Sequence, residues 1–127
     1  MKKIFRVITV ICVIFIVSIG GFLYIKSKDL PTINVSNIDL KNVSDGSYIG
    51  EYSTSLVKAK VKVNIKNNKI LSIDIIEHKC GLGKKAEKIT KEIEKSQSLD
   101  VDLITGATLS SKVILKAVQV AINKGIK

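Results

Sequence analysis

The sequence has little cysteine and only one proline, and both shortages limit how the chain can be built. Of the two cysteines, Cys12 lies inside a long apolar run, and Cys80 is the only one that follows it. The part after the run therefore cannot contain an internal disulfide, so a hydrophobic core or a bound ligand must hold it together. A recognisable nucleic-acid motif is also absent, as are internal repeats and low-complexity segments.

Acidic residues are missing from the first part of the chain, so the net charge of +10 is higher than the charge of the part that follows. Five of the 21 lysines and arginines lie at or before Lys28, whereas all 11 acids come later. The remaining part has sixteen basic and eleven acidic residues, a net charge of +5 spread along the chain. This mild basicity suits an anionic cofactor or the anionic cell envelope better than DNA or RNA, so we expect no nucleic-acid partner.

Residues 4–25 form the long apolar run, in which Arg6 is the only charge. As a helix rising about 1.5 Å per residue, the run spans roughly 33 Å, enough to cross a lipid bilayer. It is longer than the core of a signal peptide, and no small-x-small cleavage site follows it. We therefore expect an uncleaved transmembrane anchor rather than a signal peptide.

Basic residues flank this run unevenly. Lys2, Lys3 and Arg6 come at its start, and Lys26 and Lys28 follow it. The positive-inside bias favours a cytoplasmic amino terminus by about one charge, so the carboxyl-terminal domain is expected on the extracytoplasmic side. We divide the chain into a membrane anchor at 1–28, a polar tether at 29–44 and a folded domain at 45–127.

The first half of the expected domain has the pattern of β-strands. Residues 57–65 alternate strictly between apolar residues and lysine or asparagine, which predicts a half-buried antiparallel strand with a lysine-rich wet face. Asn67 and Asn68 follow, and asparagine tolerates the positive φ of a tight hairpin turn. In the next strand, one alternating set is purely apolar and is expected to face the core: Leu71, Ile73 and Ile75.

The second half has the pattern of helices. One stripe, expected to be buried, consists of Ala86, Ile89 and Ile93. A longer stripe near the end of the chain consists of Val113, Ile114, Ala117, Val118, Ala121 and Ile122. The predicted fold class is α+β: a small antiparallel sheet of about three strands packed by two helices, preceded by one N-terminal transmembrane helix.

The segment DLITGATLSSK, residues 102–112, lies where the last helix is expected to begin. Helix starts carry unsatisfied N–H groups and the positive end of the helix dipole, so they bind phosphate readily. Gly106 permits a backbone conformation closed to other residues. These residues alone leave two interpretations open. One is an ordinary N-cap by Thr108 or Ser110, and the other is a site for an anionic group among the hydroxyls of Thr105, Thr108, Ser110 and Ser111.

Two motifs give the chain a family resemblance. The first is D-G-x-Y-x-G at residues 45–50. The second is D-x-x-(S/T)-G-A-T at residues 102–108, followed by two serines and by an Ala-Val pair in the last helix. On these residues, the segment 45–124 resembles a small FMN-binding domain. That domain occurs in the C subunit of the sodium-pumping NADH:quinone oxidoreductase, in the G subunit of the Rnf complex and in membrane-anchored extracytoplasmic flavoproteins.

The resemblance implies a covalent flavin. The threonine that closes the second motif, here Thr108, would carry FMN through a phosphoester bond made by a flavin transferase with FAD as donor. The resemblance assigns recognition by the transferase, or positioning, to Asp102 and Thr105, and it assigns the tight turn and the space around it to Gly106 and Ala107. Leu109 would contact the isoalloxazine ring. Ser110 and Ser111 would bind the phosphate or cap the helix.

The resemblance also favours an electron carrier over a complete enzyme. The chain is much shorter than the Rnf and sodium-pump subunits, so the ring pocket is expected to be shallow or completed by a partner. We find no catalytic acid–base pair, and we expect a membrane dehydrogenase as the electron donor. The alternatives are a flavin-dependent reductase of a small extracellular molecule and a non-redox, membrane-tethered binding or structural domain.

Several other residues allow two interpretations each. His78, the only histidine, is expected to be a solvated loop residue or, alternatively, to lie near the flavin. With Cys80 it would supply only two metal ligands, whereas a site needs three or four, so we expect no metal. Tyr48 is expected in the core or at a sheet edge. The lysines of residues 58–66 are expected to form a solvated face or, alternatively, to dock an acidic electron-transfer partner.

Overall fold

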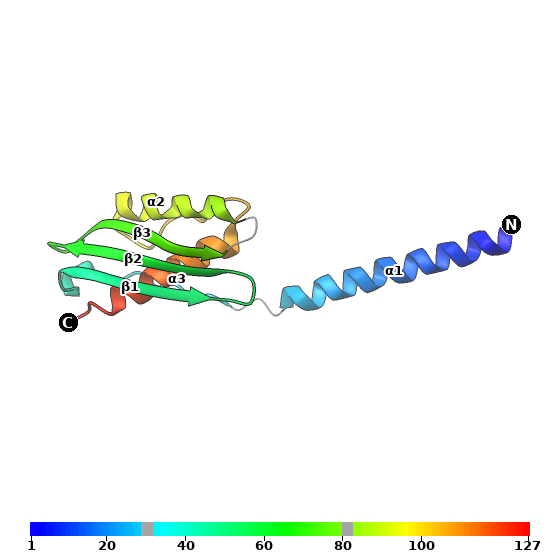
Figure 1. Ribbon diagram of the computed structural model, residues 1–127, viewed down its shortest axis with the longest axis horizontal. Coiled ribbons are helices and arrows are strands. Elements are labelled where there is room, and N and C mark those ends of the chain that lie inside the picture. Colours follow the sequence, from blue (N-terminus) through cyan, green and yellow to red (C-terminus); the bar gives the residue numbers. More distant parts are fainter. Residues whose placement is uncertain (29–31, 80–82) are drawn as a thin grey trace. The chain divides into compact units, whose positions relative to one another are not determined.

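The computed structural model describes residues 1–28, 32–79 and 83–127, with only the backbone described for residues 23–28. The chain forms two compact units, Met1–Thr32 and Ile33–Lys127. The elements are α1 (Lys2–Lys28), the 3-10 helix η1 (Leu40–Asn42), β1 (Gly46–Ser53), β2 (Lys58–Lys66), β3 (Lys69–Lys79), the 3-10 helix η2 (Lys84–Lys88), α2 (Ile89–Ser96) and α3 (Thr108–Asn123), as Figure 1 shows. An N-terminal apolar helix followed by a three-stranded antiparallel sheet packed against two helices confirms the predicted fold class.

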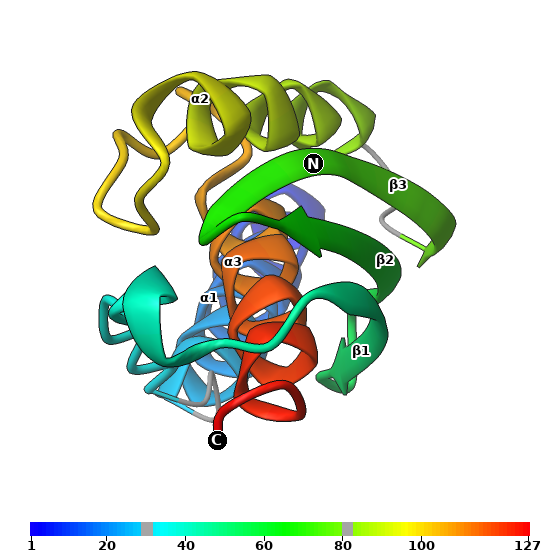
Figure 2. The same cartoon turned by 90° about the vertical axis from the view of Figure 1, so that its left-hand side faces the viewer.

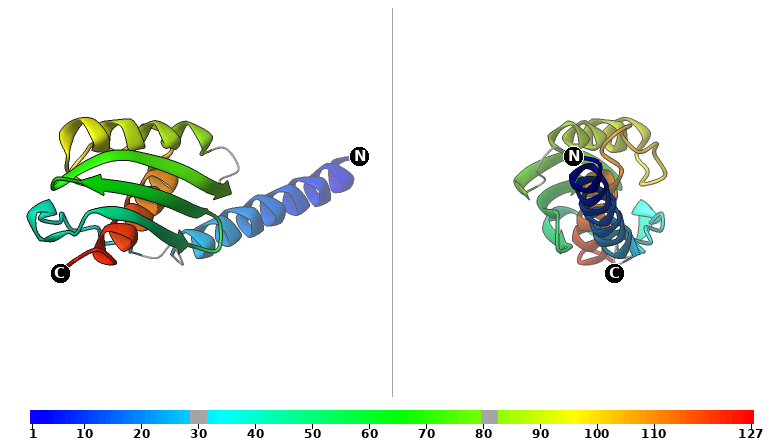
Figure 3. Two further views of the ribbon diagram at one scale, coloured as in Figure 1. Left: turned by 60° about the vertical axis from the view of Figure 1, so that its left-hand side comes forward. Right: turned by 90° about the vertical axis from the view of Figure 1, so that its right-hand side faces the viewer.

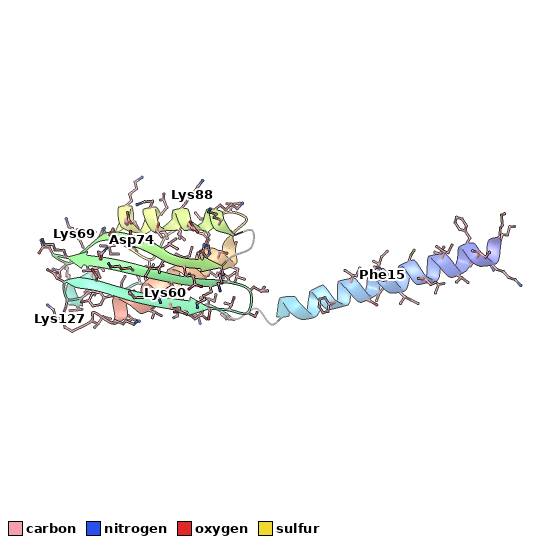
Figure 4. All side chains as sticks on the ribbon, viewed as in Figure 1. Phe15, Lys60, Lys69, Asp74, Lys88 and Lys127 are labelled. Atoms are coloured by element: carbon pink, nitrogen blue, oxygen red, sulfur yellow. The ribbon has the colours of Figure 1, made fainter. Side chains whose placement is uncertain are left out.

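The first unit consists mainly of α1. Its segment Lys2–Phe22 has a mean hydropathy of 2.5. The side chains of residues 1–22 are all exposed, including Phe15, which Figure 4 labels. Length and composition qualify this helix as either a membrane anchor or a signal sequence.

The sheet has the strand order β1-β2-β3, and both neighbouring pairs are antiparallel. Asn67 and Asn68 have φ values of 53° and 61° and form the two-residue turn between β2 and β3, as predicted. The alternation predicted for β2 is confirmed, because every second side chain is buried: Ala59, Val61, Val63 and Ile65. This buried face of the sheet forms one side of the core.

Strand β3 departs from the predicted alternation because it contains two irregularities. The ladder to β2 passes over Leu71 and Ile76, which are therefore the extra residues of two β-bulges. Leu71 is 60% exposed, whereas Ile70 is buried. The prediction that Leu71 faces the core is wrong, because a bulge changes which side chains point to each face of the sheet.

Helix α3 lies inside the curve of the sheet (Figure 2). Gly50 of β1 makes this close approach feasible, since a methyl group at this position would overlap the carbonyl oxygen of Ala117 and lie 2.5 Å from the amide nitrogen of Ala121. Both apolar stripes predicted for the helices are confirmed as buried: Ala86, Ile89 and Ile93, and Val113, Ile114, Ala117, Val118, Ala121 and Ile122. The core is therefore the layer between the sheet and these two helices.

In the first sequence motif, residues 45–50, the side chains of Asp45 and Tyr48 both make hydrogen bonds within the domain. The carboxylate of Asp45 accepts a hydrogen bond from the amide of Asn67 at 2.9 Å, next to the hairpin turn. The hydroxyl of Tyr48 donates to the carbonyl of Ser44 at 2.8 Å, and its ring lies against Gly125, after the end of α3. Tyr48 packs against the core, as one of the two interpretations expected.

Residues 33–44 pack on the domain, although the sequence predicted them as part of the tether. Ile33 and Val43 are buried. Gln119 of α3 donates from Nε2 to the carbonyl and hydroxyl oxygens of Ser36, at 3.2 and 2.6 Å. In Figure 2 this segment lies on the other side of α3 from the sheet. The compact unit therefore begins at Ile33, earlier than the sequence indicated.

Helix α2 runs alongside β3 (Figure 3) and covers the edge of that strand. Gln97, which ends the helix with a φ of 55°, accepts a hydrogen bond from the amide of Ile70 at 2.7 Å and donates to its carbonyl at 2.9 Å. Glu94 accepts from the amide of Ile73 at 2.8 Å. These side chains occupy backbone groups that would otherwise be open to a further strand.

Gly50→Val should lower the free energy of unfolding by roughly 3 kcal/mol, because the added side chain must push β1 away from α3. Urea unfolding followed by circular dichroism measures the change. Ser53→Val, on an exposed position of the same strand, should alter it by less than about 0.5 kcal/mol. Equal effects of the two substitutions would contradict the close packing at Gly50.

Candidate functional site

The second sequence motif forms a tight turn before α3. The amide of Ala107 donates to the carbonyl of Ile104 at 3.0 Å and closes the turn. Gly106 has a φ of 78° at the third position, which type II turns require and glycine adopts without strain. Thr105 and Gly106 are exposed at the tip, while Ala107 is buried. The turn therefore presents backbone and a threonine side chain to the surface.

Ser111 fixes this turn to the helix. Its side chain is fully buried, and its hydroxyl donates to the carbonyl of Ala107 at 2.7 Å while accepting from the amide of Ile104 at 3.1 Å. Ser110 is also buried, whereas Thr105 and Thr108 are exposed. Of the four hydroxyl residues predicted at the site, these two threonines are the ones that solvent and ligands reach most readily.

The start of α3 has no side-chain cap among the described residues. Ala107 occupies the N-cap position, and the first helical hydrogen bond runs from the amide of Ser111 to its carbonyl at 2.9 Å. The interpretation of Thr108 or Ser110 as the N-cap is wrong, because both residues lie inside the helix. The first amides of α3 thus keep the donor capacity that binds anions at helix starts.

Lys85 adds a positive charge at the same place. A methyl group at Gly106 would lie 2.5 Å from Nζ of Lys85 and 3.2 Å from its Cε, so the ammonium group lies against the turn. Sequence reasoning missed Lys85 because it is one of many lysines in residues 84–95, and nothing in that pattern distinguishes it. Its position strengthens the attraction of the helix start for a phosphate.

The side chain of His78 is buried and the residue belongs to β3, so the interpretation as a solvated loop residue is wrong. Its side chain is 1% exposed, and Nδ1 lies 3.1 Å from Oε1 of Glu87 in η2. Nε2 has no hydrogen-bond partner among the described residues. This contact ties η2 to the sheet, and η2 also carries Lys85. Cys80, which was considered together with His78, lies outside the described residues.

A cleft of about 780 Å³ borders the motif. One wall is a face of η2 and α2, and the other is the chain that leads to the turn. The lining residues are Lys88, Glu92, Lys95, Ser96 and residues 100–105, which include Asp102 and Thr105. This volume falls within the range of about 300–1,000 Å³ that is typical of small-molecule sites.

The lysine row of β2 is balanced by acids on both neighbouring strands. Lys60 pairs in register with Glu51 and Glu77, and the Nζ of Lys58 lies 3.0 Å from the carboxylate of Glu51. This contact lowers the pKa of Glu51 and raises the pKa of Lys58. Figure 4 labels Lys60 on β2 and Asp74 on β3. The arrangement is that of a solvated sheet face with mixed charge.

These features define a small α+β domain in which the start of α3 has the features that suit an anion: uncapped amides, a lysine, an exposed threonine and an adjoining cleft. Residues 56–123 match the FMN-binding domain family, and because the match covers more than half of the chain, the protein belongs to that family. The matched segment contains the motif turn and the whole of α3. A search of curated proteins found no match.

The cofactor of this family is FMN, and the residues at the start of α3 fit its phosphate. Free amides and an ammonium group supply donors and positive charge, while Gly106 and Ala107 leave the turn without a bulky side chain. Leu109 is half-buried and packs against the core. Asp102 is exposed, ahead of the turn.

Ser111→Ala should lower the free energy of unfolding by about 1–3 kcal/mol, because it removes two hydrogen bonds and leaves the amide of Ile104 without its acceptor. Thermal unfolding measures this loss. The matched control is Ser110→Ala, a neighbouring buried serine whose hydroxyl makes no hydrogen bond to the described residues. If the two variants are equally stable, Ser111 does not hold the turn.

Proposed function

We propose that the protein is a membrane-anchored, extracytoplasmic flavoprotein that carries FMN covalently on Thr108 and transfers electrons. The observation that supports this most strongly is the position of Thr108 in a chain of the FMN-binding domain family. Thr108 is exposed and is the first residue of the uncapped helix α3. A phosphate attracted to the helix start would therefore lie close to this residue.

The residues around Thr108 would hold the phosphate and keep it oriented. The amides of Thr108, Leu109 and Ser110 would donate to phosphate oxygens, and Lys85 would offset the negative charge. Ser111 would keep the turn rigid through its buried hydrogen bonds to Ile104 and Ala107. FMN supplies one- and two-electron transfer when it is bound, so the protein needs to provide attachment, orientation and tuning rather than an acid–base pair.

Attachment requires a flavin transferase as partner. With FAD as donor, a bond would form between Oγ of Thr108 and the phosphorus of the FMN half, while the pyrophosphate bond breaks. AMP would leave, and the hydroxyl proton would pass to a base of the transferase. Asp102 and Thr105 are exposed beside the attachment residue, which suits recognition by that enzyme.

The apolar helix α1 supports the membrane part of the proposal. Its side chains over residues 1–22 are exposed, and the segment Lys2–Phe22 has a mean hydropathy of 2.5. Lipid would cover them, and the basic residues Lys2, Lys3 and Arg6 would keep the amino terminus in the cytoplasm. The flavin domain would then face a membrane dehydrogenase or another redox partner from outside the cytoplasm.

Coexpression with a flavin transferase should increase the intact mass by that of FMN minus one water. Thr108→Ala should abolish this increase, because the accepting oxygen is lost. Thr108→Ser, which restores a hydroxyl at the same position, should retain it at least in part. An unmodified wild-type chain beside an active transferase would favour a non-redox binding domain, and an adduct that persists in Thr108→Ala would exclude this attachment residue.

The wild-type protein should remain in the membrane after alkaline extraction, and peptides from its first twenty residues should be found in the mature chain. The paired change Ile11→Lys and Ile14→Lys should release it, because each charge near the middle of a span costs about 2.5–3.5 kcal/mol on insertion. Ile11→Leu with Ile14→Leu is the matched control. Absence of the amino-terminal peptides from the mature protein would identify α1 as a cleaved signal sequence instead.

A further inference from the structure

One end of the cleft beside the motif lies nearer to Thr108 than the other. Lys88, Glu92 and Lys95 are spaced as one face of a continuous helical stretch, and the chain from residue 100 to residue 105 forms the other wall. This chain returns from the end of α2 towards η2, because Lys85 of η2 lies against Gly106. The end of the cleft at Lys88 and Thr105 is therefore the end nearest to Thr108.

The wall formed by residues 100–105 offers apolar side chains and also backbone groups that make no hydrogen bond to the described residues. Val101, Leu103 and Ile104 line the cleft, and Leu103 is 36% exposed. Residues 100–104 belong to no strand, and the backbone groups of residues 101–103 form no hydrogen bond with any described residue. Asp100 and Asp102 line the same wall, so a ligand in the cleft would meet apolar side chains that alternate with carboxylates, and unoccupied backbone donors and acceptors along them.

A flavin ring has the complementary chemistry. One end is an apolar dimethylbenzene, and the other carries an N3–H donor between two carbonyl acceptors, which can pair with extended backbone as an amide does. We propose that the cleft between α2 and residues 100–105 holds the isoalloxazine ring, with the phosphate on Thr108 at its mouth. The inference rests on the proposed function, since it requires FMN at that residue.

This position differs from the one that the sequence suggested, in which Leu109 touches the ring. Leu109 belongs to α3, packs against the core and does not line the cleft. Glu92 of α2 lines the cleft, whereas its neighbour Lys91 does not, although both residues are exposed. Lys112 lies on α3, one helical turn after Thr108. A probe placed at position 91, 92 or 112 can therefore report on which side of Thr108 the ring lies.

The chain contains no tryptophan, so a single introduced indole can serve as a local quencher of flavin fluorescence. We would prepare Glu92→Trp, Lys91→Trp and Lys112→Trp in the full-length protein, coexpressed with a flavin transferase. Glu92→Trp should lose flavin fluorescence several-fold relative to wild type, because its indole would contact the ring. Lys91→Trp and Lys112→Trp should change it little.

The other results overturn the inference. Strong quenching in Lys112→Trp with none in Glu92→Trp would place the ring on the α3 side, and equal fluorescence in all three variants would mean that the ring lies free in solvent. Intact mass is measured on each sample first, so a chain that carries no FMN identifies failure of the proposed function. Circular dichroism of each variant excludes unfolding as the cause of a fluorescence change.

Discussion

The close packing of α3 against β1, which a side chain at Gly50 would prevent, is the constraint on which the remaining structure depends. The helix lies along the inside of the sheet, where it packs on β1 and β2, and it also contacts η2. That position brings Lys85 of η2 to the turn at Gly106. The close approach at Gly50 therefore helps to position the helix on which the motif turn ends.

The beginning of α3 does not follow the usual rule for a stable helix. Several hydroxyl residues lie within reach, yet none acts as N-cap, although a side-chain cap contributes about 1 kcal/mol. Ser111 is used instead to hold the turn from inside. Local departures of this kind are expected at functional sites. On the proposed function, phosphate oxygens take the place of the missing cap.

The parts of the fold that depend on local periodicity could be predicted from the sequence. The buried face of β2, the turn at Asn67 and the core stripe of α3 follow from residue spacing alone. The bulge at Leu71 could not be predicted, because it arises from pairing with another strand. Lys85 and the packing of residues 33–44 also depend on tertiary contacts, and neither leaves a distinctive sequence pattern. The motif itself was visible, but its uncapped geometry was not.

The amide of Gln97 pairs with both backbone groups of Ile70, as a neighbouring strand would. A second copy of the protein could add to this part of the sheet only by first displacing Gln97 and Glu94 from β3. The side chains that end α2 therefore protect against edge-to-edge polymerisation under crowding.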